Sequence, residues 1–155
     1  MIVRGGENVS IVKTAYDIAR KQVFFCRSNE PIKEIARKLH VNNIGSILVK
    51  KDGDVAGIIT VNDLLRQMSR NTDVEKTLAE DIMSSPVVSV DKDLEIDELV
   101  EQFNKQRVSR MVLKDKKGEI VGVVRDIAVY KYLAFMKYDK EARKMFDKDY
   151  LHKLY

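Results

Sequence analysis

Residues 32–39 read IKEIARKL, and residues 96–103, 64 positions further on, read IDELVEQF. In both stretches the apolar residues follow the spacing i, i+3, i+4 and i+7. This spacing places the apolar side chains on one face of an α-helix. Two amphipathic helices with the same pattern at a fixed separation predict that the chain contains an internal repeat.

The repeat extends on both sides of these two helices. Upstream, the Asp-Ile dipeptide at 17–18 recurs at 81–82, with the same offset. Downstream the offset grows by one residue, so that Gly57 matches Gly122. The extra residue falls in a Gly-containing turn, where an insertion does not disturb strand register. The chain is therefore predicted to hold two copies of one structural unit.

Each copy shows the same series of elements, β-α-β-β-α, which predicts an α/β (α+β) fold class. In the first copy we expect a strand at 23–26, a helix opened by Ser28 or Asn29 with Pro31 in its first turn, strands at 46–50 and 55–60, and a helix from Val61. In the second copy we expect a strand at 87–90, a helix opened by Asp91 or Asp93, strands at 110–114 and 120–125, and a helix from Asp126.

Composition narrows the class of protein. The 155 residues are 45% hydrophobic and 34% charged, with a net charge of +4, which is typical of one globular domain or two small ones sharing a core. No apolar run approaches the roughly 18 residues of a membrane span, and no secretory signal is visible, so we expect a cytoplasmic protein. One cysteine and two histidines favour no metal site, and no nucleophile–base pair or Walker loop indicates an enzyme.

With these observations in place, the chain resembles the CBS-motif family. The resemblance covers roughly residues 10–135. It rests on NIGSILV at 43–49, GIITVNDLL at 57–65, EDIM at 80–83, VVSV at 87–90 and GVV at 122–124. It implies CBS motifs at 10–71 and 77–136, packed as a pseudo-twofold pair called a Bateman module, followed by a helical tail at 137–155.

The resemblance also carries expectations about ligands and partners. Such modules bind AMP, ADP, ATP or S-adenosylmethionine in a cleft between the motifs, and they require no cofactor. They commonly form homodimers and regulate a client protein. We therefore expect a regulatory ligand-binding module without catalytic residues. The alternatives are a dimerising scaffold that binds no ligand, and a nucleic-acid-binding protein.

The predicted ligand contacts are Thr60, Asn62 and Asp63. Thr60 ends a strand and Asp63 lies in the first turn of the next helix, where free amides and the helix dipole favour a phosphate or a polar oxygen. A carboxylate there can accept hydrogen bonds from a ribose diol, and by resemblance Gly-h-h-Thr-x-x-Asp (h, hydrophobic) is the family's ribose and phosphate signature. The alternative is that these residues only cap the helix.

Further candidates would surround the adenine base or the phosphate. An apolar slot for the base is expected from residues whose alternative role is ordinary core packing: Val23, Phe24, Ile44, Gly45 and Ile59. The second copy has Arg125 and Ala128 where the first has Thr60 and Asp63, so we expect one competent cleft. Arg110 matches a position where the family often carries a phosphate-contacting arginine, and Arg125 is a second candidate.

The tail is rich in aromatic residues. Phe135, Tyr138, Ala142 and Met145 follow helical spacing, with basic residues between them. We expect an amphipathic extension that packs on its own module or on a dimer mate. A docking helix for a client protein and a surface for single-stranded nucleic acid are the alternatives.

Overall fold

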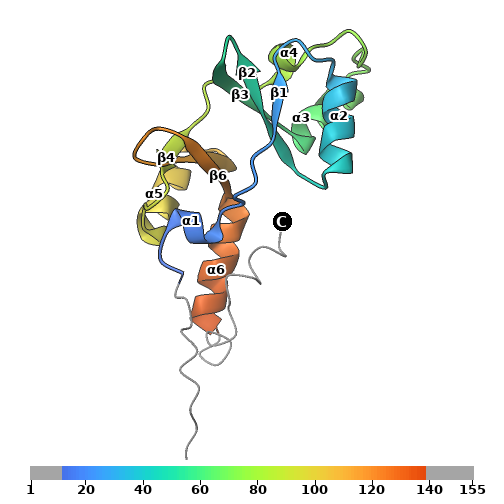
Figure 1. Cartoon of the computed structure of the whole chain (residues 1–155). Coiled ribbons are helices and arrows are strands. Elements are labelled where there is room, and N and C mark those ends of the chain that lie inside the picture. Colours follow the sequence, from blue (N-terminus) through green and yellow to red (C-terminus); the bar gives the residue numbers. More distant parts are fainter. Residues whose placement is uncertain (1–11, 139–155) are drawn as a thin grey trace, which may run out of the picture. The chain divides into compact units, whose positions relative to one another are not determined.

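The computed structural model describes residues 12–138, which divide into two units (Figure 1). Unit 2 is the continuous segment Gln22–Ser89, and unit 1 combines the chain up to Lys21 with the chain from Val90 onward. None of the helices within the described residues is long and apolar enough to cross a membrane.

Unit 2 holds the first copy of the repeat. Its elements are β1 (Phe25–Arg27), α2 (Ile32–Val41), β2 (Ser46–Lys51), β3 (Asp54–Thr60), α3 (Val61–Ser69) and α4 (Ala79–Ile82). β2 is the central strand, parallel to β1 and antiparallel to β3. Ile35 and Leu39 of α2 share a buried core with Cys26, Val49 and Ile59 of the sheet, as the apolar spacing of this helix predicts.

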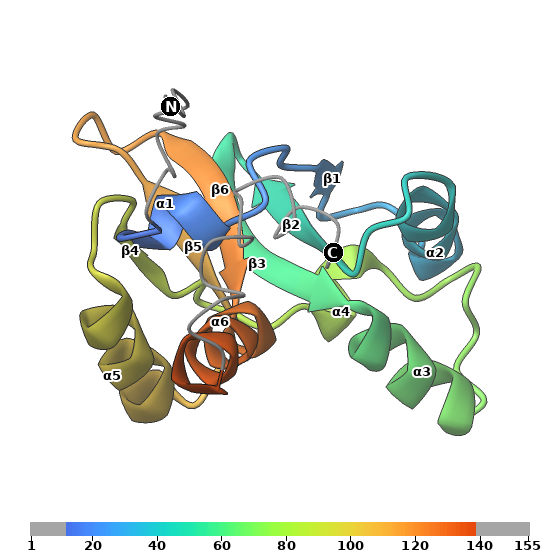
Figure 2. The same cartoon turned by 90° about the horizontal axis from the view of Figure 1, so that it is seen from below.

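Unit 1 holds the second copy. Its elements are α1 (Ala15–Ile18), β4 (Ser89–Asp91), α5 (Ile96–Gln106), β5 (Arg110–Lys114), β6 (Ile120–Arg125) and α6 (Asp126–Tyr138). The strand order is β4-β5-β6, with β5 antiparallel to β6. Figure 2 shows α5 and α6 side by side next to this sheet. Ile96, Leu99 and Phe103 form the buried face of α5, again at the predicted spacing.

Each unit contains a short helix that the repeat assigns to the other copy. In unit 1, the Ala15 amide of α1 donates to the Leu94 carbonyl at 2.8 Å, and Arg20 forms a β-bridge with Val123. In unit 2, the Ala79 amide of α4 donates to the Glu30 carbonyl at 2.8 Å, and a matching β-bridge joins Ser84 to Ile58. The two copies therefore exchange their leading segments.

The exchanged segments supply the N-terminal caps of α2 and α5. The Ile32 amide donates to the Thr77 carbonyl at 2.9 Å, and the Ile96 amide donates to the Lys13 carbonyl at 3.3 Å. Backbone carbonyls from distant sequence thus satisfy amides that a helix leaves open at its start. Within the described residues, the N-cap side chains of these two helices form no cap hydrogen bond.

The predicted side-chain caps of these helices are therefore wrong. α2 begins at Ile32 with Pro31 as its N-cap, after Ser28 and Asn29. α5 begins at Ile96 with Glu95 as its N-cap, after Asp91 and Asp93. Asp91 instead serves a local turn, because its carboxylate accepts a hydrogen bond from the Asp93 amide at 2.8 Å.

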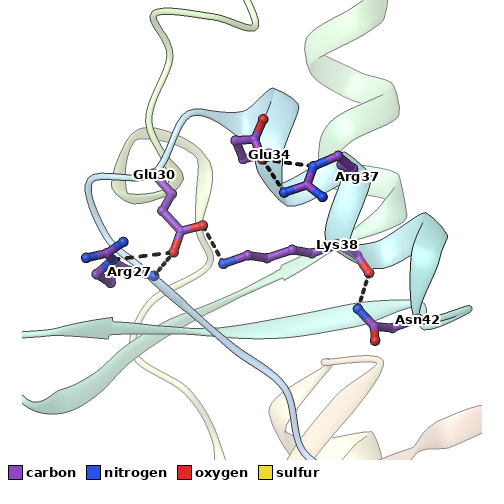
Figure 3. A network of polar contacts seen from close by, with 6 residues as sticks. All are labelled: Arg27, Glu30, Glu34, Arg37, Lys38 and Asn42. Atoms are coloured by element: carbon purple, nitrogen blue, oxygen red, sulfur yellow. Dashed lines mark hydrogen bonds and ion pairs between the residues drawn. The ribbon is translucent and has the colours of Figure 1, made fainter.

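A network of ion pairs fixes the loop before α2 (Figure 3). Glu30 accepts a hydrogen bond from Lys38 Nζ at 2.5 Å and another from the Arg27 amide at 2.9 Å. Burial alone would raise the pKa of Glu30, but these hydrogen bonds outweigh burial and hold the pKa below its ordinary value. One turn away, Arg37 pairs with Glu34 at 2.7 Å on the exposed face of the helix.

The α+β class and the repeated β-α-β-β-α series are confirmed. The strands at 110–114 and 120–125 and the helix starts at Val61 and Asp126 agree with the sequence expectation. The first strand of each copy begins two residues later than predicted. The motif limits 10–71 and 77–136 and the pseudo-twofold packing stay predictions. The predicted tail at 137–155 enters the description only through the end of α6, and residues 139–155 lie outside it.

Candidate functional site

The corner between β3 and α3 brings Thr60 and Asp63 together. Asp63 Oδ2 accepts hydrogen bonds from the Thr60 amide at 2.8 Å and from Thr60 Oγ1 at 2.9 Å. In return the Asp63 amide donates to Thr60 Oγ1 at 3.4 Å. This is a reciprocal capping box, with Thr60 as the N-cap and Asp63 at the third helical position. The capping role that the sequence left open is therefore present.

The Asp63 carboxylate is nearly enclosed, with 6% of the residue exposed. Its second oxygen, Oδ1, lies 3.4 Å from a guanidinium nitrogen of Arg66. A carboxylate offers about four acceptor positions, and these contacts use three of them. Capping thus leaves acceptor capacity at the corner. Arg66 was missed by the sequence reasoning, although its i,i+3 spacing from Asp63 was the available signal.

The backbone around this corner is closely tied to the preceding loop. The Val61 amide donates to the Gly45 carbonyl at 3.1 Å, and Ser46 is the register partner of Thr60 across β2 and β3. Asn62 follows in the first turn of α3, with an exposed side chain. The structure therefore gathers Gly45, Thr60, Asn62 and Asp63 at one strand-to-helix junction.

The apolar candidates for a base slot divide into two groups. Ile44 and Ile59 are buried in the core of unit 2, with exposures of 9% and 0%, so their side chains have the ordinary packing role that the sequence left open. Val23 and Phe24 are half-buried and precede β1. The Phe24 carbonyl accepts a hydrogen bond from the Leu48 amide at 3.0 Å, which holds this segment beside β2.

The equivalent corner of unit 1 has the same backbone hydrogen bond but different side chains. The Asp126 amide donates to the Ser109 carbonyl at 3.1 Å, the counterpart of the bond from Val61 to Gly45. Arg110 and Arg125 are register partners across β5 and β6, at the positions of Ser46 and Thr60. Ala128 replaces Asp63 and is buried, with 3% exposed. Neither the hydroxyl nor the carboxylate of the first corner is repeated.

Comparison with curated proteins finds relatives over most of the two copies. A protein from Methanopyrus kandleri is 33% identical over 110 residues, which is 70% of this chain and 56% of that protein. An inosine-5′-monophosphate dehydrogenase from Thermoplasma acidophilum is 30% identical over 119 residues, 76% of this chain and 23% of that enzyme. The chain thus spans about half or less of the length of these relatives.

Solved structures show the same fold. The CBS-domain pair of protein MJ0100, in complex with 5′-methylthioadenosine and S-adenosyl-L-methionine, is 26% identical, with a TM-score of 0.68 over 80% of this chain and 98% of that one. A hexameric CBS-CP12 protein from bloom-forming cyanobacteria has a TM-score of 0.72 at 17% identity, over 84% of this chain and 78% of that one, and shows the fold alone.

The family assignment follows from matches to both copies. The CBS domain matches residues 15–70 and again residues 79–134, so that together the matches cover well over half of the chain. CBS-domain pairs are regulatory ligand-binding modules, and both three-stranded sheets belong to such a pair. This chain belongs to the CBS-domain family.

Proposed function

We propose that this chain senses an adenosine-containing ligand, AMP, ADP, ATP or S-adenosylmethionine, at the corner formed by Thr60, Asn62 and Asp63, and passes the signal to a partner protein. The observation that carries the proposal is the hydroxyl–carboxylate pair at this corner, present in one motif and replaced in the other. The related CBS-domain pair solved with 5′-methylthioadenosine and S-adenosyl-L-methionine supports the choice of ligand class, because both molecules contain adenosine.

The corner has the chemistry that a ribose needs. The remaining acceptor capacity of Asp63 suits a sugar hydroxyl, which must donate a hydrogen bond. The amides at the start of α3 and the positive end of its dipole suit a phosphate or another polar oxygen. Asn62, exposed in the same turn, adds both a donor and an acceptor.

The capping box supports binding as well as folding. Because Thr60 fixes Asp63 through two short hydrogen bonds, the carboxylate has one orientation before a ligand arrives. A site that is already ordered loses less conformational entropy on binding. The half-buried Val23 and Phe24 are the proposed neighbours of the base, and Gly45 allows close approach to the backbone. Arg110 and Arg125 are proposed phosphate contacts, because a guanidinium group can form two parallel hydrogen bonds to phosphate oxygens.

Signalling to a partner requires two states of the module. A ligand shifts an equilibrium only by the difference between its affinities for the two states. The partner of the proposed sensor would therefore recognise the ligand-bound and ligand-free chains with different affinities.

Isothermal titration of the full chain with AMP, ADP, ATP, S-adenosylmethionine and a short oligonucleotide tests this proposal. We expect saturable binding of at least one adenosine compound, strongly weakened in Asn62→Ala. Ile127→Ala is the matched control, because Ile127 occupies the same position in the first turn of α6 and is also exposed (40%). The Ile127→Ala chain should bind the same adenosine compound with the affinity of the wild type.

Two outcomes would replace the proposal. Absence of binding to every adenosine compound would favour the dimerising scaffold. Binding of the oligonucleotide alone, falling steeply with salt concentration, would favour the nucleic-acid-binding protein.

We also propose that the chain forms a homodimer through α3. Val61, Leu65 and Met68 form one apolar stripe on this helix, and 42%, 54% and 66% of these residues are exposed. A stripe of this kind is costly to leave in water and suits an isologous contact, in which the same patch faces itself in a second copy. Light scattering coupled to gel filtration should give a dimer mass for the wild type and a monomer mass for Leu65→Glu. Val41→Glu is the matched control, since Val41 is equally apolar and 70% exposed, but lies at the end of α2.

A further inference from the structure

Unit 1 contains a pocket whose lining includes no residue of either strand-to-helix corner. Its volume is about 350 Å³, within the size range of ligand pockets in proteins. It lies between the segment that leads into α1, the start of α5 and the last turns of α6. Its lining residues are Val12, Lys13, Glu95, Ile96, Asp97, Tyr132, Leu133 and Met136.

The pocket has an apolar interior and a charged rim. Val12, Ile96 and Tyr132 are buried, with exposures of 6%, 7% and 8%. The hydroxyl of Tyr132 donates to the Val12 carbonyl at 3.2 Å, so the polar end of this side chain already has a partner. On the rim, the carboxylates of Glu95 and Asp97 and the ammonium group of Lys13 are exposed. An occupant with an apolar group and adjacent positive charge would complement this arrangement.

The pocket lies where the described chain begins and ends. Val12, which lines it, is the first described residue, and Met136, which also lines it, is two residues from the end of α6 at Tyr138. Residues 139–155 continue directly from that point. A chain of 17 residues can extend over at most about 61 Å, so these residues can turn back from the end of α6 and reach the pocket with length to spare.

The sequence of this segment matches the pocket. Residues 139–155 contain Phe146, preceded by Arg143 and Lys144 and followed by Asp147 and Asp149, with further apolar residues at Tyr150 and Leu151. An aromatic side chain has a large apolar surface to bury, and the neighbouring cations could approach the carboxylates of the rim. The other flanking segment, residues 1–11, has one basic side chain and no aromatic residue. The C-terminal segment is therefore the better complement.

We propose that residues 139–155 dock into this pocket of the same chain, with the Phe146 ring inside it and Arg143 or Lys144 beside Glu95 and Asp97. The docked segment joins the end of α6 to the start of α5. This inference is independent of the nucleotide site, because it concerns other residues and requires no ligand.

Paramagnetic broadening in NMR spectra of the full chain tests the proposal. A nitroxide is attached to D149C; the native Cys26 is buried, with its pKa raised to about 11 by burial, and so resists labelling under mild conditions. We expect the amide signals of Ile96 and Asp97 to lose most of their intensity. In a mixture of labelled chain with unlabelled, ¹⁵N-enriched chain, these signals should keep their intensity, because the contact lies within one chain.

Three variants locate the contact. Phe146→Ser and Leu133→Asp, each combined with D149C, should both restore the signals; the first leaves every described residue unchanged, so a loss of folding cannot explain its effect. Ala134→Asp is the matched control on the exposed side of α6 and should leave the broadening intact. Full intensity in the singly labelled chain, broadening only in the mixture, or broadening that survives both Phe146→Ser and Leu133→Asp would each overturn the proposal.

Discussion

Replacing Asp63 by alanine should destabilise the protein before any ligand is considered. The substitution removes two hydrogen bonds, of 2.8 and 2.9 Å, and leaves the Thr60 amide unpaired at a part-buried position. Loss of a helix cap costs about 1 kcal/mol, and a buried donor without a partner costs about 1–3 kcal/mol. We therefore expect the free energy of unfolding to fall by about 2–3 kcal/mol. For a chain of this length that lowers Tm by roughly 4–12 °C.

Thermal unfolding of the full chain, followed by circular dichroism without ligand, measures this effect. Asp63→Asn keeps an oxygen that can accept from the Thr60 amide and should lose less stability than Asp63→Ala. Asp54→Ala is the charge-matched control, since Asp54 is exposed at the start of β3. If Asp63→Ala melts at the same temperature as Asp54→Ala, the capping box does not stabilise α3 and this reasoning is wrong.

Three further predictions concern packing and ionisation. A Cβ at Gly57 would lie 2.6 Å from Met83 Sδ and 2.9 Å from the Ser84 carbonyl oxygen, whereas the nearest atom at Gly122 is the Arg20 carbonyl oxygen at 3.1 Å. Gly57→Ala should therefore lower the unfolding free energy by about 1–3 kcal/mol, and by more than Gly122→Ala, as chemical denaturation can measure. The pKa of Glu30 is lowered in the folded state, so the stabilising effect of its carboxylate is present above about pH 4.3 and is lost as the pH falls through the folded-state pKa. In a denaturation series from pH 7 to 3, the free energy of unfolding should therefore fall more steeply in the wild type than in Glu30→Gln. Burial raises the pKa of Cys26 to about 11, so a thiol reagent at pH 8 should react with unfolded chain and leave native chain unmodified; rapid reaction of the native chain would contradict its burial.

The elements of the fold were predictable where the signal is local. The spacing of Ile32, Ile35 and Leu39 predicted the buried face of α2, because helical geometry alone decides which side chains share a face. The apolar run at 23–26 predicted a strand too early. Apolar character reports burial, whereas strand assignment requires pairing, and the ladder with β2 begins only at Phe25.

The exchange of leading segments could not be predicted from local pattern. The bridges from Thr14 to Glu95 and from Pro31 to Leu78 join residues that lie far apart in the chain. Propensity and periodicity describe neighbours along the sequence, and they therefore assigned the caps of α2 and α5 to nearby side chains. The backbone carbonyls of Thr77 and Lys13 cap these helices instead, and a carbonyl carries no sequence signature.

The candidate site was predictable in its position and partly in its chemistry. Thr60 and Asp63 lie together at a helix start because their spacing allows a capping box, and that spacing is visible in the sequence. What the sequence could not show is that Oδ2 serves the cap while Oδ1 faces Arg66, since this depends on side-chain orientation. Nor could it distinguish Ile44 and Ile59, which are buried in the core, from the half-buried Val23 and Phe24.

The most direct test of the central claim is an NMR titration of the full chain with the adenosine compound that binds most tightly. The account predicts saturation at one ligand per chain, with the largest amide shifts at residues 60–63 and smaller shifts at the corresponding residues 125–128. Saturation at two ligands per chain, or shifts concentrated at 125–128 with residues 60–63 unmoved, would contradict the assignment of ligand recognition to the corner that keeps its carboxylate.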